Sequence, residues 1–119
     1  MEAYENLTTI KGVRIKATYG DTGSVSNIIY DNITLSGITD CGIVIRQDYS
    51  NSLGYTGTPT GGIPITNVTL SNIYGSVSSS ATNIDIACAN CQDWTFDNVT
   101  VTDGKTSTDC VGVPSGISC

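Results

Sequence analysis

Histidine is absent from the 119 residues of this chain. Its absence excludes Ser-His-Asp and Cys-His catalytic sets within the chain. It also removes histidine as a metal ligand and as the most common general base. Any chemistry performed by these residues must therefore rely on carboxylates, cations, hydroxyl groups or thiols.

Charge is also scarce, and what there is has an acidic bias. Charged residues make up 13% of the chain, with 11 acidic and 5 basic side chains and a net charge of −6. Binding to nucleic acid or to a membrane surface normally needs a basic face, so we expect neither partner. No apolar run approaches the roughly 18 to 20 residues that span a bilayer. The opening residues MEAYENLTT have no basic start and no apolar core, so we expect no signal peptide here.

Strong helix formers are rare, whereas β-branched residues are plentiful, which predicts an all-β protein. Four segments resemble one another: YENLTTIKG, YDNITLSGI, ITNVTLSNI and FDNVTVTDG. Their asparagines are Asn6, Asn32, Asn67 and Asn98, at spacings of 26, 35 and 31 residues. A second series comprises GVRIKA, GIVIRQ and NIDIAC, and SVSNIIY reads as a third short strand.

Repeats of about 25 to 35 residues with short alternating strands are typical of a solenoid. We therefore expect a right-handed parallel β-helix of about three to four coils; the alternative is an antiparallel β-sandwich. The chain reads as one partial domain, 1–119. Within it, 1–11 form a weakly matching first coil, 12–109 the coils and 110–119 a disulfide-closed tail, while 50–62 read as a loop leaving one coil.

Basic residues gather in one stretch, Gly-Val-Arg-Ile-Lys. Strand alternation directs Val13 and Ile15 into the coil and Arg14 and Lys16 together onto its outer face. Arg46, one coil later, is expected to point outward as well. Two parallel cations on a rigid strand suit a carboxylate or phosphate group. The alternative is a solvated pair that neutralises acids such as Asp48 or Asp21.

The chain has five cysteines, an odd number. Cys88 and Cys91 are close in sequence, as are Cys110 and Cys119, which suggests two local disulfides and an oxidising compartment. Together they would staple the C-terminal end of a solenoid. Zinc would need further ligands at suitable spacing, so we expect no metal. Cys41 is left over beside a core strand and is expected to be a buried thiol.

Each repeat asparagine also begins an Asn-x-Thr triplet, the acceptor for N-glycosylation. The candidate sites are Asn6, Asn32, Asn67 and Asn98. If these residues stack on neighbouring coils, glycans on all of them would collide. A structural Asn/Thr row with one or two occupied sites is therefore expected.

Paired carboxylates could hydrolyse a glycosidic bond if they were held roughly 5 to 10 Å apart. Asp31, Asp40 and Asp48 lie within one expected coil, but nothing in the sequence marks two of them as facing each other. No autonomous catalytic set is expected.

Four segments taken together carry a family resemblance: GVRIK, SGITDCGIVIRQDY, TGTPTGGIPITNVTL and CANCQDWTFDNVTVTDGKTSTDCVGVPSGISC. Over residues 12–119 the chain resembles the C-terminal portion of a fungal endo-polygalacturonase of glycoside hydrolase family 28. The resemblance implies a secreted right-handed parallel β-helix that hydrolyses α-1,4-linked galacturonan, the pectin backbone, with inversion and without a cofactor.

The resemblance also implies roles for particular residues. Arg14 and Lys16 would bind a substrate carboxylate, and Tyr49 would line the cleft. The resemblance also implies that the last four cysteines pair locally. Cys41 stands where the family usually has tyrosine. The implied partners are polygalacturonate, or pectin, and plant polygalacturonase-inhibiting proteins.

The family's catalytic residues lie in Asn-Thr-Asp, Asp-Asp and Gly-His-Gly segments, none of which occurs in this sequence. We therefore expect that the chain alone does not hydrolyse pectin at the family's rate. One alternative is a non-catalytic module that binds pectin or occupies an inhibitor as a decoy. A pectate-lyase-like site would need an acidic calcium cluster before Arg14, and the sequence has none there.

Overall fold

The computed structural model describes residues 11–119, which form seven β-strands and no helix. The strands are β1 (Lys11–Thr18), β2 (Val25–Ile38), β3 (Cys41–Ser50), β4 (Gly54–Tyr55), β5 (Ile65–Val77), β6 (Thr82–Ala87) and β7 (Cys91–Thr102). The all-β prediction is confirmed. Residues 11–119 include no helix long and apolar enough to cross a membrane.

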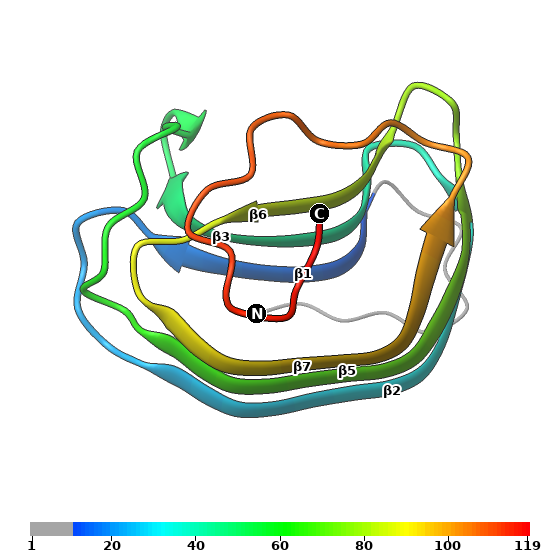
Figure 1. The fold of residues 1–119 in the computed structure, drawn as a ribbon. Coiled ribbons are helices and arrows are strands. Elements are labelled where there is room, and N and C mark those ends of the chain that lie inside the picture. The colour runs from blue at the N-terminus through cyan, green and yellow to red at the C-terminus, as the bar shows by residue number, and fades with distance from the viewer. Residues whose placement is uncertain (1–10) are drawn as a thin grey trace.

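The strands form two parallel sheets that face each other (Figure 1). One contains β1, β3 and β6 in that order, and the other contains β2, β5 and β7. The chain alternates between the sheets, so each circuit adds one strand to both. Only the short β4 pairs antiparallel, with the end of β3. This parallel pairing contradicts the antiparallel sandwich alternative.

Stacked aliphatic side chains fill the space between the sheets. Ile15, Ile45 and Ile86 occupy equivalent positions on β1, β3 and β6, and each is fully buried. On the opposite sheet, Val68 and Leu70 point inward and are also fully buried. Alternation thus buries the aliphatic residues of this strand, β5, and leaves Asn67 exposed. The predicted series GVRIKA, GIVIRQ and NIDIAC is likewise one ladder.

Left-handed backbone residues bend each long strand of the second sheet. Apart from glycines, two such residues occur in every one of β2, β5 and β7, and all are Asn or Asp. They are Asn27, Asn32, Asn67, Asn72, Asp93 and Asn98, with φ between 52° and 62°. Asn and Asp tolerate this conformation better than other residues that have a Cβ atom. SVSNIIY and YDNITLSGI consequently belong to one bent strand, β2, and not to two.

The register corrects the asparagine row predicted from the repeat. Asn67 is opposite Asn27 and donates a 2.7 Å hydrogen bond to it across 40 residues. Asn98 is opposite Asn72 and donates a 3.0 Å hydrogen bond to it across 26 residues. Asn32 shares the second row, so Asn67 lies in a different row from Asn32 and Asn98. The repeat pattern predicted the wrong row because each strand carries two corners with nearly the same Asn-aliphatic pattern.

The segment 50–62 folds back onto β3 instead of leaving the coil as a simple loop. β4 pairs with the end of β3, Tyr55 opposite Tyr49. Thr56 then donates its backbone N–H to the Asp48 carbonyl at 2.9 Å, and Thr60 donates to the Gln47 carbonyl at 3.1 Å. This segment therefore covers the outer face of β3.

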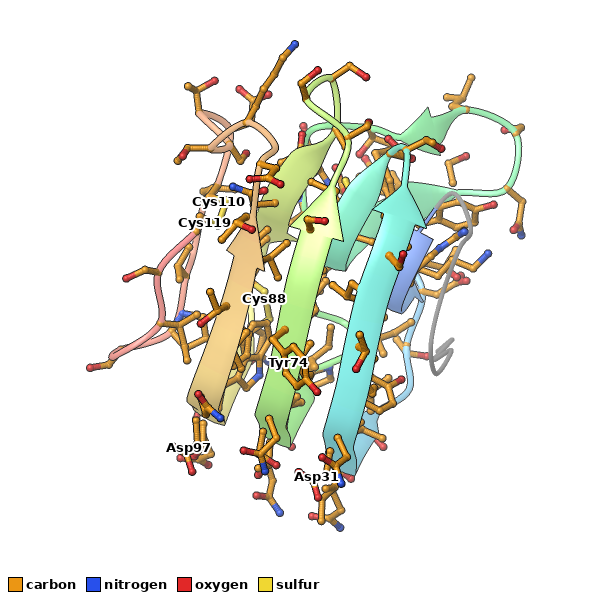
Figure 2. All side chains as sticks on the ribbon, turned by 90° about the vertical axis from the view of Figure 1, so that its right-hand side faces the viewer. Asp31, Tyr74, Cys88, Asp97, Cys110 and Cys119 are labelled. Carbon is orange, nitrogen blue, oxygen red and sulfur yellow. A yellow bond between two sulfur atoms is a disulfide. The ribbon has the colours of Figure 1, made fainter. Side chains whose placement is uncertain are left out.

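The C-terminal segment 103–119 lies along the outer edge of β6. Isolated parallel bridges join Thr82 to Lys105 and Ala87 to Val111. Disulfides Cys88–Cys91 and Cys110–Cys119 are present, the two local pairs that the sequence suggests. Figure 2 shows Cys110 and Cys119 beyond β7, at the end of the sheet away from β2. Cys41 is buried and outside any disulfide, as predicted.

Candidate functional site

Glycine is the second residue of both strands that carry the basic residues, because the neighbouring backbone is too close for a side chain. A Cβ atom at Gly12 would collide with the carbonyl oxygen of Gly42 on the next strand. A Cβ atom at Gly42 would lie 2.7 Å from the carbonyl oxygen of Asn83. These contacts bring β1, β3 and β6 close together at the start of GVRIK and GIVIRQ.

Alternation along β1 then separates apolar from basic side chains. Val13 and Ile15 are fully buried in the core. Arg14 and Lys16 lie on the other face of the strand and are half-buried. The register sets Arg14 beside Val44 and Lys16 beside Arg46.

The structure brings Tyr49 to this basic pair. The Lys16 Nζ atom lies 4.3 Å from the centre of the Tyr49 ring, and the Arg14 Cζ atom lies 5.9 Å from it. Both distances fall within the range of cation–π attraction. The three residues singled out by the resemblance are thus one cluster, formed by β1 and the end of β3.

Tyr55 is a further aromatic residue of this cluster that the sequence did not reveal. Its ring meets the Tyr49 ring edge-to-face, with centroids 5.8 Å apart and planes at 70°. Its hydroxyl group is buried without a hydrogen-bond partner among residues 11–119. Burial raises the pKa of Tyr55, so the phenol stays protonated at neutral pH.

Arg46 lies on the outer face of the strand, as alternation predicts, but it is covered and not exposed to solvent. It is beside Lys16 but only 9% exposed, because the 50–62 segment covers it. Asp48 accepts hydrogen bonds of 2.9 Å from its Nε and 2.7 Å from its Nη2, and Asp85 accepts one of 2.8 Å from its Nη1. The Tyr55 ring lies 4.7 Å from its Cζ atom. Arg46 is a third cation in the row, neutralised internally by two carboxylates.

The ionisation of this network follows from its contacts. Hydrogen bonding to Asp48 raises the pKa of Arg46, which stays charged. Burial alone would raise the pKa of Asp48, but hydrogen bonds from Arg46 and from the Gly57 N–H outweigh it and hold the pKa low. Both carboxylate oxygens of Asp48 therefore accept hydrogen bonds within the protein. The sequence-based alternative had Asp48 neutralising Arg14 and Lys16; its carboxylate pairs with Arg46 instead.

Gln47 is a second buried polar residue that the sequence did not reveal. Its side chain is completely buried and makes four hydrogen bonds. Its amide donates to the carbonyls of Ile63 and Asn90 and accepts from the N–H groups of Ala89 and Asn90. Gln47 thereby ties the turn before β5 to the turn before β7. A signal was available: Arg46, Gln47 and Asp48 interrupt strand alternation with three consecutive polar residues.

The three aspartates considered for catalysis do not form an acid–base pair. Asp48 is bound by Arg46, whereas Asp31 lies on an exposed corner of β2 (Figure 2). Hydrogen bonds from Ser71 and Asn72 lower the pKa of Asp31. Asp40 is in the turn before β3 and exposed. Residues 11–119 hold no group of three or more side chains that could bind a metal ion.

The N-glycosylation candidates Asn32, Asn67 and Asn98 are all exposed, whereas Asn6 lies outside the described residues. They do not form one row of neighbours. Asn32 and Asn98 are separated by Asn72 in one row, and Asn67 lies in the other. The premise that these asparagines stack on neighbouring coils is therefore wrong for these three positions.

Comparison with known proteins gives one consistent family. The family model for glycosyl hydrolases family 28 matches residues 5–119. The chain is 62% identical over 108 residues to an endo-polygalacturonase of Sclerotinia sclerotiorum, covering 91% of this chain and 28% of that protein. It is 58% identical over 110 residues to polygalacturonase 2 of Penicillium olsonii, covering 91% of this chain and 29% of that protein.

These similarities place the chain in one protein class, the glycosyl hydrolases. The chain belongs to glycosyl hydrolase family 28. It spans less than a third of the length of the relatives that it matches.

Proposed function

We propose that the chain supplies the C-terminal coils of a polygalacturonase and carries half of its substrate site. In this proposal the two parallel sheets are the coils of a right-handed parallel β-helix, one partial domain over 1–119. Arg14 and Lys16 bind the carboxylate of a galacturonate unit, and Tyr49 lies beside the sugar. Polygalacturonate, the backbone of pectin, is the partner, and the location is extracellular, which suits two disulfides.

The clustering of Arg14, Lys16 and Tyr49 is the observation that carries this proposal. Arg can offer a planar fork for two hydrogen bonds to a carboxylate, and Lys adds a mobile point charge. The Tyr49 ring is 4.3 Å from the Lys16 Nζ atom and limits where that charge lies. A polyanionic sugar chain matches two cations that share one strand face.

The catalytic half of the site is proposed to lie outside this chain. The Asp48 carboxylate is paired with Arg46, and Asp31 lies on an exposed corner of the other sheet, so neither is placed for catalysis. The chain by itself is therefore expected to bind galacturonate without cleaving it.

Binding of a defined galacturonate oligomer to the purified chain tests the proposal. We expect Arg14→Ala and Lys16→Ala each to weaken binding about 10- to 100-fold, the range for losing a hydrogen bond to a charged group. Lys105→Ala is the matched control, since it removes an exposed cation from the C-terminal segment. Equal losses in all three variants would show only nonspecific attraction and would refute the assigned site.

Reducing-sugar release from polygalacturonate tests the second part. We expect no release by the wild-type chain above the rate of a heat-treated sample. Substantial release that Arg14→Ala abolishes would show that the chain contains a complete catalytic site.

A further inference from the structure

We propose that the buried Arg46–Asp48 ion pair is a positioning device for the binding face. It fixes Tyr55, and Tyr55 holds the Tyr49 ring against Lys16. Arg46 itself is covered, and its side chain donates to Asp48 and Asp85, so its role is indirect. The consequence for binding rests on the function proposed above, whereas the arrangement of the rings does not.

The first step is the fixed plane of the Arg46 guanidinium. Asp48 accepts two parallel hydrogen bonds from it, at 2.9 and 2.7 Å, and Asp85 accepts a third at 2.8 Å. Such bidentate contacts restrict the orientation of the guanidinium group as well as its position. Arg46 is thus held rigidly, at a strand position directly beside Lys16.

The second step is the attachment of the covering segment to the same carboxylate. Asp48 accepts a 2.7 Å hydrogen bond from the Gly57 N–H, and its backbone carbonyl accepts one of 2.9 Å from Thr56. Tyr55 precedes these two anchors, and its ring lies 4.7 Å from the Arg46 Cζ atom. One ion pair therefore fixes Tyr55 both through its backbone and through its ring.

The third step is the contact between the rings. Tyr55 meets Tyr49 edge-to-face at 5.8 Å, and the face of Tyr49 lies 4.3 Å from the Lys16 ammonium. Edge-to-face pairs are directional, so moving one ring moves the preferred place of the other. Any tilt of Tyr55 should therefore change how Lys16 is held.

Nuclear magnetic resonance of the chain without ligand tests this relay. A ring close to an ammonium group shifts the signals of the adjacent Lys16 methylene protons upfield. Arg46→Lys keeps the positive charge but loses the planar fork, and Tyr55→Leu removes the ring contact but leaves the ion pair. We expect both variants to lose most of the upfield shift. Tyr55→Phe, which keeps the ring, should retain it.

The same variants are then titrated with a galacturonate oligomer. Arg46→Lys and Tyr55→Leu should weaken binding about fivefold, the size expected for one cation–π contact, while Tyr55→Phe binds like wild type. Wild-type Lys16 signals in Arg46→Lys would overturn the positioning role of Arg46. Wild-type signals in Tyr55→Leu would overturn the ring relay.

Two further comparisons separate failure of the positioning role from a folding defect and from failure of the proposed function. If Arg46→Lys does not fold, Asp48→Asn addresses the same ion pair, with Asp31→Asn on the exposed β2 corner as its charge-matched control. If wild-type chain does not bind the oligomer while the Lys16 signals respond as expected, the proposed function fails and the positioning device stands.

Discussion

Both sheets carry polar residues, but those of β3 are buried and those at the corners of the other sheet are exposed. On β3 the consecutive residues Arg46, Gln47 and Asp48 are buried, and every one is held by several hydrogen bonds. On β2, β5 and β7 the corner residues are exposed and form short ladders, such as Asn67 with Asn27. The first arrangement can orient a site, whereas the second mainly shapes the backbone.

This difference has a physical cause. A buried polar group costs free energy when its partner is lost, whereas an exposed one exchanges its partner for water. Substitutions of the buried polar residues of β3 should therefore be costly, and substitutions at the exposed corners should be mild. Three sets of substitutions test that contrast, and removal of the disulfides tests the C-terminal end, from the largest expected effect to the smallest.

Gln47→Leu should have the largest effect. The change keeps the side chain's approximate size but removes the partner of the Ile63 carbonyl and of the Ala89 and Asn90 N–H groups. The Asn90 carbonyl keeps only its hydrogen bond from the Ile65 N–H. We expect the free energy of unfolding to fall by about 3 to 5 kcal/mol, measured by urea denaturation. The exposed Gln92→Leu is the control and should change stability by no more than ~0.5 kcal/mol. Similar losses in both variants would break the contrast between buried and exposed polar residues.

Removal of the disulfides tests how the C-terminal segment is fastened to β6. Replacing Cys110 and Cys119 together with Ala opens a span of 9 residues, and replacing Cys88 and Cys91 opens one of 3. The chain-entropy account predicts losses of about 3 and about 2 kcal/mol. Thermal unfolding of both double variants measures them. The reverse order would mean that packing around buried Cys88 outweighs the effect of span length.

Asp48→Asn should flatten the acid limb of the stability curve. The folded-state pKa of Asp48 is lowered, so its contribution is fully present above its ordinary value of 3.8 and is lost as the pH falls through the folded pKa. We expect a loss of about 1 to 3 kcal/mol at pH 7, the range for hydrogen bonds to a charged group. Urea denaturation between pH 7 and pH 2.5 measures both effects.

Asp31→Asn provides the matched comparison on the exposed face. The pKa of Asp31 is also lowered, through Ser71 and Asn72, but its carboxylate is exposed to solvent. Its removal should change the acid limb less than Asp48→Asn does. A larger effect at Asp31 would contradict the ranking of the two faces.

Asn72 should show the smallest effect, and one that depends on the replacement. Its φ is 52°, so Asn72→Ala places a side chain without local hydrogen bonds in the left-handed region, at a cost of about 1 to 2 kcal/mol. Asn72→Gly relieves that cost and loses only exposed hydrogen bonds, so it should be nearly neutral. Equal losses for Ala and Gly would show that the ladder contacts matter more than the backbone conformation.

Much of the fold was predictable from the sequence because period-two alternation marks the core directly. Val13 and Ile15 are buried as alternation requires. The register of the asparagines was not predictable in the same way. Asn67 and Asn72 stand before similar aliphatic residues, and only the strand pairing decides which of them faces Asn32.

The candidate site was predictable in part. Alternation put Arg14 and Lys16 on one face, and the family resemblance added Tyr49. The structure brings these three residues into one cluster. The positions of Arg46 and Tyr55 depend on the segment 50–62, which folds back over β3. No periodic pattern in the sequence predicts that it does so. Asp85, a partner of Arg46, comes from a strand 39 residues away in the chain.

Carboxylate recognition by Arg14 and Lys16 is the central claim, and one comparison of affinities tests it most directly. A galacturonate oligomer and its fully methyl-esterified counterpart have the same sugar rings but differ in charge. We predict that the chain binds the charged oligomer at least ~10-fold more tightly, as expected for losing hydrogen bonds to a charged group. Equal affinity for the two oligomers would contradict the account.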